Sequence, residues 1–201
     1  MSEQQQYHHG DLRNKLISIS LEMLQENGMP GLSLRKLAER AGVSRSAPYH
    51  HFKDKNDLLA AVAEQGFEVL TEQLSSAISR TDLSMQERLE LTIQCYLSFA
   101  MENDTQYELM FGRELWRDNP SPRLQRTAKD CFRAYAQLPE QFHQQGLLKA
   151  DDDPLRLAQV MWSTLHGLIK ISHDGIVVRK EDLADISRYA LAHLIPVTTS
   201  S

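Results

Sequence analysis

Apolar residues recur at helical spacing along most of the chain, and no stretch alternates apolar and polar residues with a period of two. The spacing predicts helices over residues 9–27, 33–42, 46–52, 55–79, 84–102, 105–116, 121–145, 155–172 and 181–194. The segments 84–102 and 155–172 are apolar on more than one side, which is typical of helices inside a bundle. We therefore expect an all-α fold of about nine helices, in which a three-helix head precedes a helical bundle.

Local signals sharpen several of these helices. Ser84 and Glu87 form a capping box, and Asp54 is a cap for the long helix that follows it. Gly66 lies inside that long helix, so either a neighbour packs closely against it or the helix bends. Pro139 lies inside the predicted helix 121–145 and predicts a kink or a one-turn interruption there.

Residues 33–52, with the sequence SLRKLAERAGVSRSAPYHHF, have the pattern of a helix-turn-helix. Ala38 is small where a second helix must cross closely, and Gly42 suits the turn between the two helices. Val43 is expected to be buried behind the turn, and a hydroxyl from Ser44 or Ser46 to cap the second helix. Pro48 has no N–H and biases the residue before it away from helix, so this second helix should begin late, near Ser46, or have a distorted first turn.

The run VSRSAPYHHFKDKNDLL resembles the signature of the tetracycline-repressor (TetR) family of bacterial transcription regulators. The resemblance covers roughly residues 9–60, and Pro48 departs from it because the family usually has Leu there. A second run, WSTLHG, resembles the Trp-x-x-x-His-Gly motif of one group of C-terminal domains in this family. The resemblance implies a DNA-binding domain at residues 9–54, with its helix-turn-helix at 33–52, and a ligand-binding and dimerisation domain at residues 55–195.

The candidate DNA contacts fall into two groups. Tyr49 and His50 resemble family positions that touch phosphates, whereas Arg45 and Ala47 are suited to base edges, Arg to guanine and Ala to a thymine methyl group. The full set is Ser33, Ser44, Arg45, Ser46, Ala47, Tyr49, His50, Lys53 and Lys55. The alternative for Arg45 and Lys53 is an ordinary solvated surface charge.

Aromatic side chains are frequent between residues 96 and 166, as expected of an apolar pocket between helices, although a well-packed core would look the same. The candidate ligand-binding residues are Tyr96, Phe99, Tyr107, Phe111, Trp116, Tyr135, Trp162 and His166. His166 could hydrogen-bond an effector, or bind a metal with His143 or His173, but a core or interface histidine is the favoured interpretation. We expect no metal site, no cofactor and no catalytic constellation, and therefore no enzyme.

The charge is unevenly distributed. Residues 1–60 carry eight Lys and Arg against seven Asp and Glu, whereas residues 61–201 carry 14 against 20. A weakly positive head on an acidic body suits DNA binding by one end of the molecule. Cys95 and Cys131 lie in apolar helices, where ordinary buried thiols are favoured over a redox pair. Neither a signal peptide nor a membrane-length apolar run is evident, which predicts a cytoplasmic protein.

These observations predict a homodimer, joined through its two C-terminal helices, that binds a palindromic double-stranded DNA operator. In this hypothesis the protein is a repressor that a small-molecule effector releases. One alternative is a co-regulator controlled by protein partners and without a diffusible ligand. A second is a metal sensor or a helical enzyme that carries a head resembling a helix-turn-helix.

Overall fold

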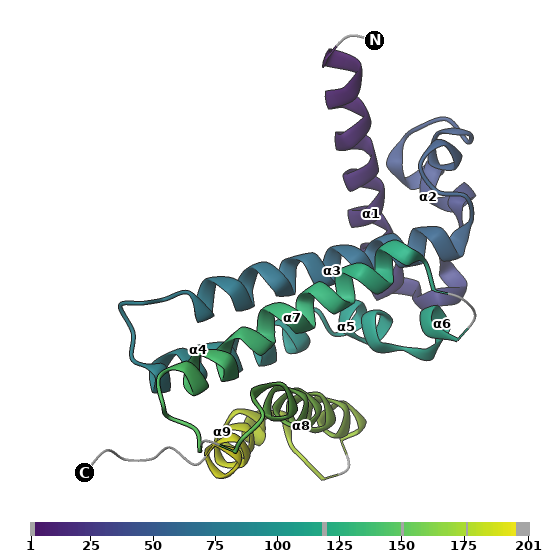
Figure 1. Cartoon of the computed structure of the whole chain (residues 1–201). Helices are drawn as coiled ribbons and strands as arrows, with labels where there is room; N and C mark the ends of the chain where they lie inside the picture. Colours follow the sequence, from purple (N-terminus) through teal and green to yellow (C-terminus); the bar gives the residue numbers. More distant parts are fainter. Residues whose placement is uncertain (1–2, 118–119, 150, 176, 196–201) are drawn as a thin grey trace. The chain divides into compact units, whose positions relative to one another are not determined.

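The computed structural model describes residues 3–117, 120–149, 151–175 and 177–195, and no strand occurs among them (Figure 1). The all-α prediction is thus confirmed. In chain order the helices are α1 (Glu3–Gly31), α2 (Leu34–Ala41), η1 (Ala47–His50), α3 (Lys55–Ile78), α4 (Met85–Glu102), α5 (Asp104–Phe111), α6 (Arg113–Trp116), α7 (Pro122–Gln144), α8 (Pro154–Asp174), η2 (Lys180–Asp182) and α9 (Leu183–Leu194), where η1 and η2 are 3₁₀-helices.

The chain forms two compact units. The first contains Met1–Phe67 and Asn103–Ala128, and the second contains Glu68–Glu102 and Lys129–Ser201. Helices α3 and α7 therefore each contribute residues to both units. The functional division at residue 54 into a DNA-binding and a regulatory domain remains a prediction.

Helix α1 begins earlier than the predicted residue 9, and its regular part ends at Gly28, as expected. Gly28 has φ 63° and ψ −172°, a conformation that residues with a Cβ rarely adopt, so the chain kinks there although helical turns continue to Gly31. Helix α1 packs on α2, and the two lie side by side in Figure 1. Their contact buries Leu16, Ile17 and Leu37 in the core of the first unit.

The structure tests two expectations about helix continuity, and the first was wrong. The predicted helix 105–116 is divided at Gly112, whose extended backbone (φ −73°, ψ 148°) separates α5 from α6. A Cβ at Gly112 would lie 2.6 Å from the Glu108 carbonyl oxygen, so this approach requires glycine. Helix α7 runs through Pro139 without a one-turn interruption, and the other alternative predicted there, a kink, stays a prediction.

Helix ends follow the side chains that cap them. Ser84 and Glu87 exchange the two hydrogen bonds of a capping box: the Ser84 N–H donates to a Glu87 carboxylate oxygen at 2.8 Å, and the Glu87 N–H donates to the Ser84 hydroxyl at 3.3 Å. The Asp54 carboxylate accepts from the Asp57 N–H at 2.9 Å and so begins α3. Asp153 begins α8 in the same way. In the second unit α4, α8 and α9 contact one another.

Candidate nucleic-acid interface

Helix α2 begins with an exposed polar end and ends in a tight turn. The Ser33 hydroxyl accepts from the Lys36 N–H at 3.2 Å, which leaves the hydroxyl proton available to a phosphate. Gly42 is left-handed at φ 68°, and the Val43 N–H donates to the Ala38 carbonyl at 3.0 Å, so the helix ends in a Schellman turn.

The second helix of the motif is a single 3₁₀ turn, η1. Its bonds link residues three apart: the Tyr49 N–H donates to the Ser46 carbonyl at 3.1 Å, and the His51 N–H to the Pro48 carbonyl at 3.0 Å. Pro48 occupies the first turn, where its missing N–H leaves no bond unmade. The prediction that this helix begins late, near Ser46, or has a distorted first turn is therefore confirmed, since it begins at Ala47 as a 3₁₀ turn.

Two details of the turn were predicted wrongly. Neither Ser44 nor Ser46 caps the helix; their hydroxyl oxygens lie 3.2 Å apart and hydrogen-bond each other. Val43 is half-buried rather than buried, whereas Pro48 and Phe52 are buried.

Six of the nine predicted DNA contacts are exposed, and all six lie between residues 44 and 53. The exposed members are Ser44, Arg45, Ser46, Tyr49, His50 and Lys53, whereas Ser33, Ala47 and Lys55 are half-buried. Residues three apart eclipse one another in a 3₁₀ turn, which places Ala47 and His50 on the same side of η1. Pro48 and Phe52 anchor the opposite side in the core. The arrangement presents a polar surface, rich in hydrogen-bond donors, on an apolar support.

Lys55 has a structural partner as well. Its ammonium group donates to the Met29 carbonyl at the end of α1. The C-terminal end of a helix carries a partial negative charge, which also stabilises a cation there. An ammonium group has three donors, so this bond leaves two for a phosphate.

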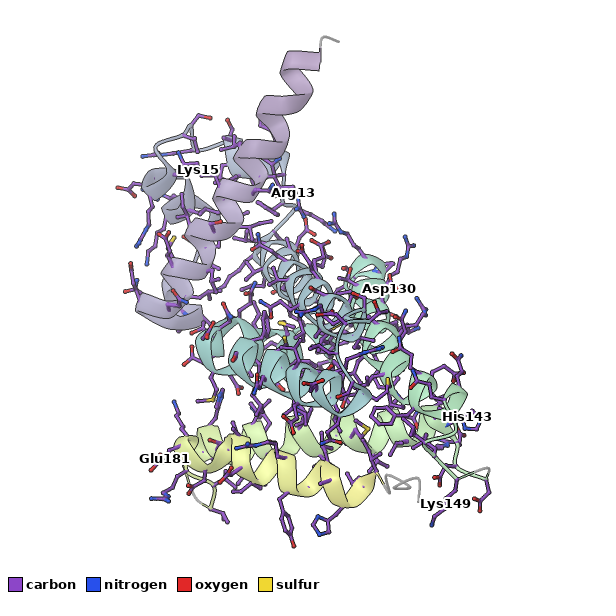
Figure 2. The ribbon with its side chains drawn as sticks, turned by 90° about the vertical axis from the view of Figure 1, so that its left-hand side faces the viewer. Arg13, Lys15, Asp130, His143, Lys149 and Glu181 are labelled. Carbon is purple, nitrogen blue, oxygen red and sulfur yellow. The ribbon has the colours of Figure 1, made fainter. Side chains whose placement is uncertain are left out.

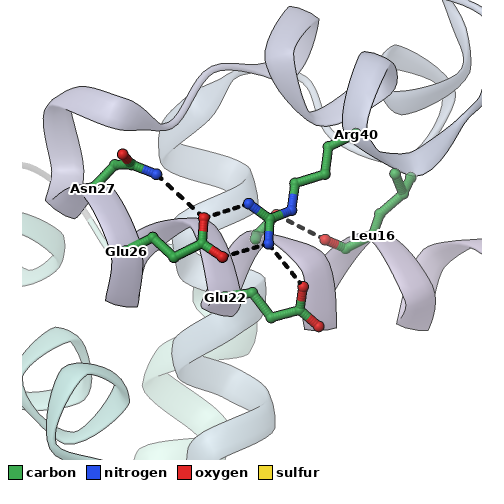
Figure 3. Close-up of polar contacts among 6 residues, drawn as sticks. Leu16, Glu22, Glu26, Asn27 and Arg40 are labelled. Carbon is green, nitrogen blue, oxygen red and sulfur yellow. Dashed lines mark hydrogen bonds and ion pairs between the residues drawn. The ribbon is translucent and has the colours of Figure 1, made fainter.

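An ion-pair cluster fastens α2 to α1. Figure 3 shows Arg40 reaching from α2 to Glu22 and Glu26 on α1. One guanidinium nitrogen lies 2.6 Å from Glu26 Oε1 and 3.3 Å from Glu22 Oε2, and a second nitrogen bonds Glu26 Oε2. The hydrogen bond from Arg40 lowers the pKa of Glu26, and the same bond raises the pKa of Arg40.

Four further cations, which the sequence did not single out, lie near the helix-turn-helix motif. Arg35 and Lys36 are exposed in the first turn of α2, beside the Ser33 cap. Arg13 and Lys15 lie on α1 (Figure 2), and the Arg13 guanidinium carbon sits 5.5 Å from the centre of the Phe52 ring. The signal that could have found Arg35 and Lys36 is their position: basic residues at a helix N-terminus face whatever anion that end binds.

The candidate ligand residues separate into two aromatic clusters. In the first unit Phe111 contacts Tyr107 and Phe67, with ring centres 4.8 and 5.3 Å apart, and Trp116 lies 6.4 Å from Phe67. In the second unit Trp162 meets three rings edge-on: Tyr96 at 4.9 Å, Tyr135 at 5.1 Å and Phe132 at 5.6 Å. The second unit also contains Phe99, which is buried, and His166, which is half-buried.

Tyr135 is unusual within this second cluster. Its hydroxyl is buried and has no hydrogen-bond partner among the residues that the structure describes. Burial raises the pKa of Tyr135 far above its ordinary value, so the group stays a protonated donor. A buried donor without an acceptor costs about 1–3 kcal/mol, which makes this hydroxyl a candidate contact for a ligand oxygen.

The described residues include no group of three His, Cys, Asp or Glu side chains placed to hold a metal ion. Within the same part of the chain, no helix combines the length and the apolar character needed to cross a membrane.

Comparison with known families matches both halves of the chain. Residues 16–62 match the family "Bacterial regulatory proteins, tetR family", and residues 89–194 match "Tetracyclin repressor-like, C-terminal domain".

The similarity to individual curated proteins covers only part of the chain. The chain is 44% identical over 69 residues to the class A tetracycline repressor protein from transposon 1721 of Escherichia coli, which covers 34% of this chain and 31% of the repressor. It is 31% identical over 111 residues to the nucleoid occlusion factor SlmA of Aliivibrio fischeri, covering 53% and 55% of the two chains. The chain thus spans only about a third to a half of the length of these curated relatives.

The fold extends further than the sequence identity. A solved structure of a Rhodococcus sp. RHA1 protein of unknown function has a TM-score of 0.79 at 29% identity, covering 94% of this chain and 98% of that chain. The regulator FadR of Bacillus subtilis, solved in complex with stearoyl-CoA, has a TM-score of 0.69 at 20% identity, covering 90% and 96%.

Proposed function

Because the chain belongs to the TetR family of bacterial regulatory proteins, we propose that it binds a specific DNA operator and regulates transcription there, as a repressor that a small molecule releases. The regulators of this family bind operators and small-molecule effectors and typically dimerise. In this proposal residues 9–54 bind DNA, and residues 55–195 bind the effector and the second subunit.

The observation that carries the DNA-binding proposal is the 3₁₀ turn with its exposed donors. Arg45, Ser46 and Ala47 would read base edges, while Tyr49, His50 and Lys53 would contact phosphates. The supporting cations Arg35 and Lys36 would add phosphate contacts at the start of α2. A good contact between arginine and guanine discriminates against other bases by about 1–3 kcal/mol.

The apolar surface of the C-terminal helices supports a homodimer. Five of the seven large apolar side chains that are exposed in the described chain lie on α8, on α9 or between them: Leu155, Val160, Ile171, Val177 and Tyr189. Arg156, Gln159, Val160, Ser163 and Thr164 line a shallow hollow on α8. Exposed apolar side chains gathered in one region mark interaction surfaces, and a pair of helices from each subunit would form a four-helix interface. Two recognition turns would then reach successive major grooves roughly 34–36 Å apart.

The aromatic cluster around Trp162 is the proposed effector site in the second unit. The rings of Tyr96, Phe132 and Tyr135 provide an apolar surround, and the Tyr135 hydroxyl provides one donor. This combination favours a mostly apolar effector that carries an oxygen acceptor. Tyr107, Phe111 and Trp116 form a separate candidate surface in the first unit.

The test is selection of a DNA site from a random library, followed by fluorescence anisotropy with that site and with unrelated DNA over a salt series. Arg45→Ala is expected to weaken binding to the selected site by about 1–3 kcal/mol and to leave unrelated DNA almost unaffected. Lys53→Ala is expected to weaken both and to reduce the salt slope by about 1. Arg133→Ala is the matched control, because Arg133 is an exposed cation on α7.

Addition of a cell metabolite extract then tests release by an effector. Weaker binding in the extract supports a ligand-released repressor. Unchanged binding in the extract contradicts that part of the proposal and favours control by protein partners. Binding without any preference for the selected site contradicts the proposal as a whole.

A further inference from the structure

One turn of α3 in the first unit is contacted by two other segments, α5 and the start of α7. The Gln106 side chain on α5 donates from Nε2 to the Val62 carbonyl at 2.8 Å, and both ends of this bond are buried. One turn further on, Gly66 lies against α5 so closely that a Cβ there would be 2.4 Å from Met110 Sδ and 3.0 Å from Gln106 Cγ. This close packing explains the glycine inside α3.

Glu64 lies between these two contacts and is held by the start of α7. Its side chain is 7% exposed, and Arg123 Nε lies 3.1 Å from Oε2. The Ser121 hydroxyl donates to Oε1 at 3.2 Å. The same Ser121 oxygen accepts from the Leu124 N–H at 3.0 Å, so one hydroxyl both begins α7 and binds Glu64.

A carboxylate at this depth is costly unless it is paired, and two of its contacts come from the start of α7: Ser121, which caps the helix, and Arg123 in its first turn. The position of the α7 N-terminus and the position of the Glu64 side chain therefore depend on each other. A shift of α7 that separated these groups would break both contacts of a buried carboxylate, so positions of α7 between paired and separated are costly. Such a contact behaves as a two-state element rather than a soft one.

Helix α7 continues without a break into the second unit, where it supplies Phe132 and Tyr135 to the aromatic cluster around Trp162. The helix that carries these rings is the same helix that Ser121 caps and that holds Arg123 in its first turn. Helix α3 begins at Lys55, directly after the recognition turn and its anchor Phe52. The contact at Glu64 is therefore common to the helix that carries the proposed effector residues and the helix that leaves the head.

We propose that the contact of Glu64 with Ser121 and Arg123 couples the two sites, and that Glu64 is a positioning residue for the DNA-binding head. This inference rests on the proposed function, because it assigns the route by which the effector site would act on operator binding. By linkage the effect is reciprocal: DNA bound at the head changes the stability of the α7 N-terminus. That reciprocity allows a test without knowledge of the effector.

The experiment compares hydrogen exchange of full-length protein with and without the selected DNA site, alongside the dissociation constant of that DNA. In the wild type, saturating DNA is expected to change the exchange of residues 121–128 as well as that of the head. In Glu64→Gln the response at residues 121–128 is expected to disappear, and the dissociation constant to change by about 5-fold or more. The salt slope should stay unchanged, because no phosphate contact is removed.

Two further variants make the result specific. Arg123→Gln removes the other half of the pair from an exposed position and should reproduce the effect of Glu64→Gln, so it decides the question where the buried substitution prevents folding. Arg133→Gln removes an exposed ion pair on the same helix and should behave as the wild type. The partner of Arg133 in this pair is Asp130, which Figure 2 labels.

The inference would be overturned if Glu64→Gln and Arg123→Gln both kept the hydrogen-exchange response of the wild type at residues 121–128 and its dissociation constant for DNA. The proposed function would remain intact in that case. Absence of site-selective DNA binding by the wild type would instead refute the proposed function, and the inference with it.

Discussion

Substitution of Gly66 by alanine separates two opposing effects at the packed turn of α3. Alanine is a better helix former than glycine by about 1 kcal/mol, so helix propensity alone favours the change. The added Cβ would lie 2.4 Å from Met110 Sδ, more than 1 Å inside the roughly 3.5–4.0 Å separation of atoms in contact. Overpacking of this kind costs about 1–3 kcal/mol. We expect Gly66→Ala to lower the free energy of unfolding by about 1 kcal/mol in net terms.

The sign of the effect should reverse when the neighbour is shortened. In a Met110→Ala background the collision with the sulfur is gone, although Gln106 Cγ would still lie 3.0 Å from the new Cβ, so Gly66→Ala is expected to stabilise by at most about 1 kcal/mol. The two effects give a coupling energy of about 1–2 kcal/mol in a double-mutant cycle. Gly167→Ala is the matched control, because Gly167 also lies inside a helix but a Cβ there would meet nothing within 4 Å. It should stabilise by about 0.5–1 kcal/mol.

The assay is guanidinium unfolding followed by far-UV circular dichroism at one fixed protein concentration, since dimerisation makes stability depend on concentration. If Gly66→Ala alone stabilised the protein as much as Gly167→Ala, α5 would not pack against this turn, and the reasoning about Gly66 would be refuted. A coupling energy near zero would refute it equally.

Three further outcomes follow from other contacts. Arg40 holds the pKa of Glu26 below 4.5, so the stabilisation from this pair is complete above that value and disappears as the pH falls through the lower folded-state pKa; denaturation midpoints of the wild type should fall more steeply below about pH 4.5 than those of Arg40→Ala. Tyr135→Phe should stabilise by about 1 kcal/mol in urea unfolding, because it removes a buried donor that lacks an acceptor; destabilisation would show that the hydroxyl is satisfied. Burial raises the pKa of Cys131 to about 11, so a thiol reagent at about pH 8 should label it only after denaturant is added, and rapid labelling of the native protein would revive a redox role.

Features set by near neighbours in the chain could be predicted from sequence. The capping box of Ser84 and Glu87 and the cap at Asp54 depend on residues three positions apart, and the structure contains both. The distortion of the recognition turn likewise follows from Pro48 alone, because a missing N–H and a fixed φ act on adjacent residues.

Features set by distant partners could not be predicted. Glu64 and Ser121 are 57 positions apart, and Gln106 and Val62 are 44 apart, so no local pattern marks either contact. The grouping of the candidate effector residues could not be predicted from sequence either. Aromatic content identified Tyr107 and Tyr135 equally, but only the packing of the helices assigns them to different clusters.

The composition of the first unit from two separate stretches of chain has a consequence for its synthesis. The ribosome releases residues in order at about 5–20 per second, and Ala128 lies 61 positions after Phe67. The helix-turn-helix can therefore form about 3–12 s before α5 and the start of α7 are available to cover α3. Through that interval the turn from Val62 to Gly66 presents its apolar surface and the Glu64 carboxylate to water and to chaperones. Folding during synthesis should thus pass through a stage in which the helix-turn-helix is formed but the contacts of α3 with α5 and with the start of α7 are still absent.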